Sequence, residues 1–367
     1  MTLDELDTPA LVLERGLVAA NAARLKQRLA ALGVPLRLHV KTAKCAQVAA
    51  LVLDGEKAPI TVSTLKEAEQ FFEAGYRDIL YAVGFGPQKL ARAQALARRG
   101  AQLTLLVDSV EAARGTTGFP VLIEIDTDGH RAGVKPEDSA RLVAIARALE
   151  QSGSTAAGVL THAGASYDSA STAQIEAIAA QERNGAVAAS QALRQAGFAA
   201  PVVSIGSTPT AHFARDLTGI SEVRAGVYVF FDLVMAGIEV CRREDIALSV
   251  LATVIGHRDD KGWILVDAGW MALSRDRGTA RQKQDQGYGV VCDLDGREIA
   301  DLVVTEANQE HGIVARRGGG APPQIPVGTR LRILPNHACA TGAQHDRYHV
   351  VDGGREVRSV WPRFGGW

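Results

Sequence analysis

Two short segments near opposite ends of the 367-residue chain carry side chains that are able to do chemistry. Lys41 closes a strand-like run, residues 36–41, and stands just before a segment with helical spacing. In a barrel enzyme, an amine at that place would hold a carbonyl compound. His337 and Cys339 stand one residue apart near the other end, and both side chains bind zinc well. The two segments together predict an enzyme that uses an amine and a metal ion.

The bulk composition is that of an ordinary globular protein, with 47% hydrophobic and 22% charged residues. The 40 basic and 41 acidic residues leave a net charge of -1, which gives no electrostatic case for nucleic acid or an anionic membrane. No apolar run reaches the about 18 residues of a membrane span, and the acidic, polar start is unlike a signal peptide. The cysteines are scattered: Cys45, Cys241, Cys292 and Cys339. We therefore expect a reduced, cytoplasmic protein that binds neither nucleic acid nor membrane.

Short apolar or β-branched runs alternate with helix-length segments over the first two thirds of the chain. The runs are residues 36–41, 60–63, 79–83, 103–108, 120–126, 158–161, 202–206 and 222–224. Helical spacing is found, for example, at residues 90–99, 138–149 and 175–195. Eight such alternations predict a (β/α)8 TIM-type barrel over residues 1–240. A doubly wound open sheet is the alternative, but it usually has fewer strands and a Gly-rich first turn, which is absent here.

The texture changes after about residue 240, where short strands are separated by turn residues. The expected strands are residues 250–255, 263–267, 289–292 and 331–334. This pattern predicts a second, C-terminal all-β domain over residues 241–367, on which the first few residues of the chain are candidates to pack. The Gly-rich stretch 318–324 is interpreted as a flexible loop, because no Lys-Ser/Thr pair and no helical pattern follow it.

The chemistry of a (β/α)8 barrel lies at the carboxyl ends of its strands, so the residues that follow each predicted strand matter most. They include Arg131 after the fifth strand, His162 and Tyr167 after the sixth, Ser207 and Thr208 after the seventh, and Gly226, Val227 and Tyr228 after the eighth. Small residues after strands seven and eight form the usual phosphate site of such barrels. An amine, a phosphate site and aromatic residues around one barrel mouth suggest pyridoxal phosphate, whose aldehyde is held as a lysine Schiff base.

Each of these residues also has a simpler interpretation when it is taken alone. Lys41 could be a solvated strand-end lysine, and Lys44 is the rival amine, although it falls in the first turn of the next helix. Residues 206–210 could be a plain helix N-cap with a proline just inside the helix. Arg131, His162 and Tyr167 could be ion-pair or packing residues. The joint pattern is explained less easily in this way than any single member.

The spacing of His337 and Cys339 favours a shared metal ion. Alternate residues of an extended segment project to the same side, so an imidazole and a thiolate can reach one ion. Two protein ligands are too few for a closed structural site, and substrate or water would complete a catalytic one. The alternative is a buried cysteine beside a capping histidine. His311 and His345 are spare ligand candidates.

Several motifs together resemble those of the fold-type III pyridoxal phosphate enzymes, within them the D-threonine aldolase and D-serine dehydratase family, whose barrel is that of the alanine racemase N-terminal domain. The motifs lie at residues 39–44, 161–167, 206–210, 224–232, 266–269, 310–312 and 335–339, so the resemblance runs nearly end to end. The resemblance implies Lys41 as the Schiff-base lysine and Arg131 near the ring hydroxyl. It further implies His162 and Tyr167 near the ring, and Ser207, Thr208, Gly226, Val227 and Tyr228 around the phosphate.

The metal pair separates members of this family. Its aldolases typically carry His-x-Asp with a hard ion, and its dehydratases typically carry His-x-Cys with zinc, as in His337-Ala-Cys339 here. The resemblance thus implies a homodimeric, zinc-dependent dehydratase that converts a D-3-hydroxy amino acid, such as D-serine or D-threo-3-hydroxyaspartate, to a 2-oxo acid and ammonia. A metal-dependent D-threonine aldolase, using Mn²⁺ or another divalent ion and giving glycine plus an aldehyde, is the alternative. A racemase and a non-catalytic pyridoxal phosphate carrier are more remote.

Overall fold

The structure, a computed structural model, describes residues 1–367 and separates into two compact units. Residues 23–226 form one unit together with the last two residues, and residues 1–22 and 227–365 form the other. The two units divide after residue 226, whereas the sequence suggests a domain boundary after residue 240. That later boundary stays a prediction. The amino-terminal residues belong to the second unit because their strand, β1 (Ala10–Glu14), is hydrogen-bonded to two strands from the C-terminal part of the chain.

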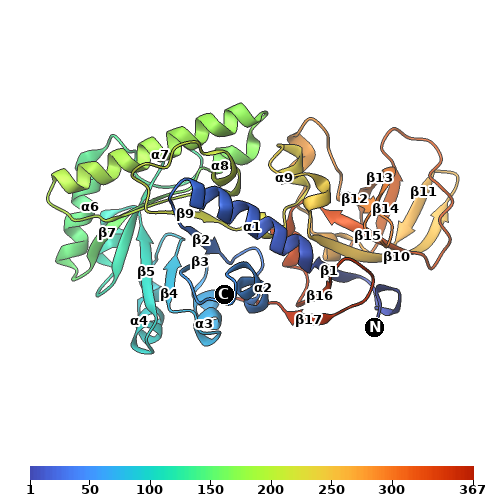
Figure 1. The fold of residues 1–367 in the computed structure, drawn as a ribbon, viewed down its shortest axis with the longest axis horizontal. Coiled ribbons are helices and arrows are strands. Elements are labelled where there is room, and N and C mark those ends of the chain that lie inside the picture. The colour runs from blue at the N-terminus through green and yellow to red at the C-terminus, as the bar shows by residue number, and fades with distance from the viewer. The chain divides into compact units, whose positions relative to one another are not determined.

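The first unit is a closed barrel of parallel strands, with its helices around the outside (Figure 1). The strands are β2 (Leu36–His39), β3 (Ile60–Val62), β4 (Asp78–Tyr81), β5 (Gln102–Val107), β6 (Pro120–Ile125), β7 (Thr155–Thr161), β8 (Val202–Ile205) and β9 (Glu222–Ala225). Each predicted run overlaps one of them, and β2 pairs with β9 to close the ring. The predicted (β/α)8 architecture is confirmed.

Helices alternate with the strands of the barrel. They are α1 (Arg15–Ala31), α2 (Ala46–Val52), α3 (Leu65–Glu73), α4 (Leu90–Arg98), α5 (Val110–Arg114), α6 (Ser139–Gln151), α7 (Thr172–Gln195) and α8 (Thr208–Phe213). Helix α1 leads into the first barrel strand, and α2 to α8 each follow a barrel strand in the expected alternation. Side-chain caps start several of them: Thr64 accepts the amide of Glu67 at the start of α3, and Ser171 accepts that of Gln174 at the start of α7. None of the helices combines the length and the apolar character needed to cross a membrane.

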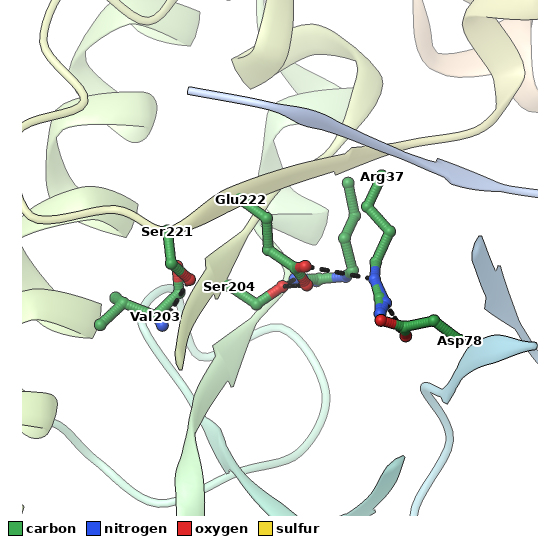
Figure 2. A network of polar contacts seen from close by, with 7 residues as sticks. Arg37, Asp78, Val203, Ser204, Ser221 and Glu222 are labelled. Carbon is green, nitrogen blue, oxygen red and sulfur yellow. Dashed lines mark hydrogen bonds and ion pairs between the residues drawn. The ribbon is translucent and has the colours of Figure 1, made fainter. Parts of the chain in front are cut away.

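A polar network joins strands at one end of the barrel (Figure 2). The Arg37 guanidinium donates to Glu222 over 3.2 Å and to Asp78 over 3.0 Å. Glu222 also accepts from the Ser204 hydroxyl over 2.6 Å, and that hydroxyl accepts from Arg224 over 2.7 Å. Asp78 and Glu222 are the first residues of β4 and β9, so these charges lie at the amino ends of the strands. The opposite ends are therefore left for chemistry.

The second unit contains a nine-stranded sheet in the order β11-β14-β13-β12-β15-β10-β1-β16-β17. The C-terminal strands are β10 (Leu248–Arg258), β11 (Trp263–Val266), β12 (Gly289–Cys292), β13 (Glu298–Ala307), β14 (Gly312–Arg316), β15 (Arg330–Pro335), β16 (Arg347–Val351) and β17 (Ser359–Pro362). The pairs are antiparallel except β1 with β16. The β-rich character is confirmed, but four of these eight strands, β13, β14, β16 and β17, were not predicted from the sequence. The sequence analysis also missed the short helices α9 (Leu233–Gly237), α10 (Trp270–Leu273) and α11 (Ala338–Gly342).

One glycine of the barrel is required by the close approach of two strands. Gly158 lies in β7, beside an irregularity in the pairing of β6 with β7, and has a φ of +149°. A Cβ atom there would overlap the carbonyl oxygen of Val202, its pairing partner on β8. A side chain at this position would therefore strain the backbone and push β7 and β8 apart.

Gly158→Ala is expected to lower the free energy of unfolding by about 3 kcal/mol, because backbone strain and overpacking each cost on the order of 1–3 kcal/mol. Gly153→Ala is the control, since Gly153 also has a positive φ of +78° but a Cβ atom there meets nothing within 4 Å. Its cost should stay near about 1 kcal/mol. Denaturant titration followed by circular dichroism measures both losses, and equal losses would contradict the steric argument.

Candidate active site

Lys41 lies in the turn that follows β2, within the barrel unit. The sequence analysis extended this strand to Lys41, which is wrong, because the ladder ends earlier. The amide of Val40 still donates to Thr61 on β3, but the amide of Lys44 turns back to the Val40 carbonyl over 2.8 Å. The turn places Lys41, partly buried, beyond the carboxyl end of the strand, where barrels carry their chemistry.

The rival amine, Lys44, has a structural partner. Its Nζ lies 3.0 Å from a carboxylate oxygen of Glu67, a side chain that is only 2% exposed. The other oxygen of Glu67 accepts the amide of Ser63 over 2.9 Å, which fixes the carboxylate at the start of α3. A buried carboxylate needs such a cation, so the Lys44 amine serves the fold of this loop.

Two histidines beside Lys41 are held in the neutral state. Desolvation, together with the charge of Lys41, lowers the pKa of His162 to about 3 and that of His39 well below its ordinary value. Arg224, whose own pKa burial lowers to about 10, acts on both histidines in the same direction. Both histidines therefore face cationic side chains while they stay neutral themselves.

The loops after β7 and β8 meet through hydrogen bonds. The Ser166 and Ser207 hydroxyls lie 2.8 Å apart, and the Tyr167 hydroxyl accepts the amide of Thr208 over 3.4 Å. The rings of His162 and Tyr167 have centroids 6.0 Å apart. The structure thus brings together four of the candidate residues, His162, Tyr167, Ser207 and Thr208, at the carboxyl ends of neighbouring strands.

Ser207 caps the short helix α8. Its hydroxyl accepts the amide of Thr210, and the Thr210 hydroxyl accepts the amide of Ser207, which is a reciprocal capping pair. The carboxyl end of β9 lies close to the end of β2, since a Cβ atom on Gly226 would lie 2.9 Å from the His39 carbonyl oxygen. Small residues, hydroxyls and amide groups at these strand ends are the donors that suit a phosphate group.

The remaining barrel candidates are placed differently. The Arg131 side chain is 58% exposed, pairs with Glu124 over 3.2 Å, and adds its charge to those that lower the pKa of His162. Val227 and Tyr228 follow Gly226 in the chain but belong to the other compact unit, in a short 3-10 helix, Val227–Val229. Tyr228 is fully buried there, and burial raises the pKa of its hydroxyl.

His337 and Cys339 lie at the start of α11 in the second unit. His337 is the extended N-cap residue and Cys339 is the second residue of the helix, so the expectation of a continuous extended segment is wrong. Asp232 explains the helix, because its carboxylate accepts the amide of Ala338 over 2.9 Å. The two side chains still meet, since a hydrogen bond joins His337 to Cys339.

Asp276 orients the imidazole of His337. Its carboxylate lies 2.5 Å from His337 Nδ1, a carboxylate–histidine pair of the kind found behind metal-binding histidines. Burial by itself would lower the pKa of His337, but hydrogen bonds to Asp276 and Cys339 outweigh it and raise the pKa to about 11. Asp276 carried no sequence signal, and Asp232 appeared only as the last residue of the motif at residues 224–232, with nothing to link it to residue 337.

The metal pair has two protein donors and no more. The structure contains no group of three or more His, Cys, Asp or Glu side chains arranged to hold a metal ion. His345 Nε2 donates to the carbonyl oxygen of Ala272 over 3.0 Å, and His311 is exposed. One nitrogen and one sulfur donor, with a carboxylate behind the nitrogen, fit an open zinc site that outside ligands complete.

Comparison with protein families gives two matches that together span most of the chain. Residues 14–234 match the family described as alanine racemase, N-terminal domain. Residues 247–351 match the family described as putative serine dehydratase domain.

Individual relatives are similar over the whole chain. D-threo-3-hydroxyaspartate dehydratase of Delftia sp. (strain HT23) is 57% identical over 100% of this chain and 99% of its own length. Its solved structure covers 100% of both chains with a TM-score of 0.97, and a metal-free cysteine-to-alanine variant of it gives 0.96 at 56% identity over the same span. D-serine dehydratase of Dictyostelium discoideum is 28% identical over 97% of this chain and 96% of its own.

A solved aldolase is more distant. D-threonine aldolase from Filomicrobium marinum is 26% identical, with a TM-score of 0.84, over 99% of this chain and 96% of that one. The lysine-bearing barrel, the metal pair on the β-rich unit and the end-to-end similarity lead to one conclusion. The chain belongs to the fold-type III pyridoxal phosphate-dependent lyases, in the family that contains the D-threo-3-hydroxyaspartate and D-serine dehydratases.

Proposed function

We propose that this protein is a zinc-dependent dehydratase of D-3-hydroxy amino acids, with D-threo-3-hydroxyaspartate as its first candidate substrate and D-serine as its second. The observation that carries the proposal is the 57% identity, along the full chain, to a D-threo-3-hydroxyaspartate dehydratase. The sulfur donor beside His337 supports it, because a thiolate favours zinc over the harder divalent ions.

Lys41 is the proposed catalytic residue of the barrel. Bound pyridoxal phosphate supplies an electron sink for the charge left on the α-carbon when a proton is removed. Lys41 would hold the cofactor in the resting enzyme, and its amine, once freed by the substrate, would accept the α-proton at Nζ. We assign the cofactor's surroundings to Arg131, His162 and Tyr167 beside the ring, and to Ser207, Thr208, Gly226, Val227 and Tyr228 at the phosphate.

His337 and Cys339 are the proposed metal ligands. A bound zinc ion supplies Lewis acidity to the β-hydroxyl, which is otherwise a poor leaving group. Asp276 holds the imidazole from behind and so presents its second nitrogen to the ion. Loss of the hydroxyl leaves an enamine, which hydrolyses to the 2-oxo acid and ammonia.

The proposed location, oligomeric state and partners follow from the same resemblance. We propose a cytoplasmic homodimer, with only small molecules as partners. The near-balanced charge of -1 supports the lack of a nucleic acid partner. Light scattering of the purified holoenzyme tests the dimer, and a monomeric mass would contradict it.

The two lysines should separate chemistry from stability. Lys41→Ala is expected to lose the visible absorption of the lysine-bound cofactor and to lower kcat by more than about 1,000-fold. Both the lysine–cofactor bond and the removal of the substrate's α-proton are lost in this variant. Lys44→Ala should keep that absorption but lower stability by about 3 kcal/mol, because Glu67 is left as an unpaired buried charge. Absorption spectra and thermal melts measure both effects, and the reverse pattern would show that Lys44 is the cofactor lysine.

Metal removal should stop the reaction without releasing the cofactor. A chelator is expected to lower 2-oxo acid formation by more than about 100-fold, because hydroxide departure depends on the Lewis acid. The visible cofactor absorption should persist, and zinc should restore activity better than magnesium. Cys339→Asp should shift the metal preference toward manganese. Undiminished turnover by metal-free protein would overturn the proposed role of zinc.

Product analysis distinguishes elimination from aldol cleavage. The holoenzyme is incubated separately with D-threo-3-hydroxyaspartate, D-serine and D-threonine. The expected products from the first two are ammonia and a 2-oxo acid, because the β-hydroxyl departs as the α-proton is removed. Glycine plus an aldehyde as the main products would support the aldolase alternative instead.

A further inference from the structure

Glu182 is a buried carboxyl group that the proposed mechanism does not use. It lies in the middle of α7 and is 1% exposed. It shares the buried face of the helix with Ala179, Ala186 and Ala189, at the spacing of a core-facing stripe. A carboxyl group is costly to bury, and an apolar residue would suit this position better for packing alone. Its presence therefore calls for specific polar partners.

Those partners are backbone amides from two different loops. One carboxyl oxygen, Oε1, accepts the amide of Ala163 over 3.0 Å and the amide of Gly206 over 3.0 Å. Ala163 directly follows His162 in the loop after β7, and Gly206 directly precedes Ser207 in the loop after β8. One side chain on the outer helix thus ties together the two loops that carry candidate site residues.

The Gly206 peptide is held from both sides. Its amide donates to Glu182, and its carbonyl oxygen accepts from His162 Nδ1 over 2.9 Å. Gly206 has a φ of +139°, and a Cβ atom there would overlap the carbonyl oxygen of Arg224. This backbone conformation of Gly206 is rarely populated in an unfolded chain, so the hydrogen bonds to Glu182 and His162 are needed to maintain it.

The geometry points to Glu182 as a positioning residue, which fixes the loops after β7 and β8 so that Ser207 and Thr208 are presented to the phosphate group of the cofactor. This inference rests on the proposed function, because it needs pyridoxal phosphate in the barrel. Glu182 touches neither cofactor nor substrate in this role. It acts through the Gly206 and Ala163 amides, which would be buried without acceptors in its absence.

The two loop amides need the accepting oxygen of Glu182, since both donate to Oε1. Burial raises the pKa of its carboxyl, against the opposing effects of Thr210, the two amides and the buried cation Arg224. Glutamine keeps the accepting oxygen and the length of the side chain, so Glu182→Gln should preserve the function. Leucine keeps a similar volume but accepts nothing.

The test compares two ligands that differ only in the phosphate group. Affinities for pyridoxal phosphate and for pyridoxal are measured by absorption titration of cofactor-free protein prepared from the holoenzyme. Glu182→Leu is expected to weaken pyridoxal phosphate binding by about 10-fold or more while pyridoxal binding changes by less than about 3-fold. Glu182→Gln should keep both affinities within about 3-fold of the wild type. Glu176→Ala is the matched control, a half-buried glutamate of the same helix that pairs with Arg215.

The outcomes separate a positioning role from a merely structural one. The inference would be overturned if Glu182→Leu weakened the binding of pyridoxal phosphate and of pyridoxal equally, or left both affinities unchanged. If the leucine variant does not fold, Glu182→Asp serves in its place, because a carboxyl group one methylene shorter cannot reach both amides. In that variant the affinity for pyridoxal phosphate, divided by the affinity for pyridoxal, should fall by about 3-fold or more. An unchanged ratio of the two affinities would again overturn the inference. A wild-type protein without visible absorption in pyridoxal phosphate would instead refute the proposed function.

Discussion

Closure of the barrel by the pairing of β2 with β9 is the constraint on which the cofactor site depends. Parallel strands in a closed ring have all their carboxyl ends at one rim, so residues from sequence positions far apart converge there. The Arg37 network occupies the opposite ends of the strands and neutralises its own charges. Lys41, the His162 loop and the Ser207 loop therefore share one end of a rigid frame, although more than 160 residues of chain separate the first from the last.

Electrostatics at that rim follows from burial. Desolvation keeps His39 and His162 neutral, while Lys41 and Arg224 supply positive charge nearby. Neutral imidazoles can hydrogen-bond to carbonyl groups without repelling the lysine, as His162 does with Gly206. The carboxyl of Glu182 adds two amide contacts on the outer side of the same loops. The rim therefore places neutral histidines beside cationic side chains, in loops that hydrogen bonds hold together.

The metal pair depends on a different local device. A short helix begins at Ala338 because Asp232 accepts its amide, and this start places Cys339 within hydrogen-bonding reach of His337. Asp276, from a loop 61 residues earlier in the chain, then fixes the imidazole. Two irregular loops and one helix cap thus prepare a pair of donors that the sequence shows only as a short motif. Because both acids act through loops, no periodicity in the sequence identifies them.

The sequence by itself determined the eight strands of the barrel and the β-rich character of the second domain, and it supplied Lys41, the loop residues and the His337–Cys339 pair as candidates, because periodicity and spacing are local properties of the chain. It suggested that the first residues of the chain pack on the second domain, but it did not reveal that residues 10–14 form a strand of that sheet, or that Lys44 pairs with Glu67. Nor could it assign Glu182, Asp232 and Asp276 to their partners. These features are contacts between distant segments, and only the tertiary structure decides which buried donor meets which acceptor.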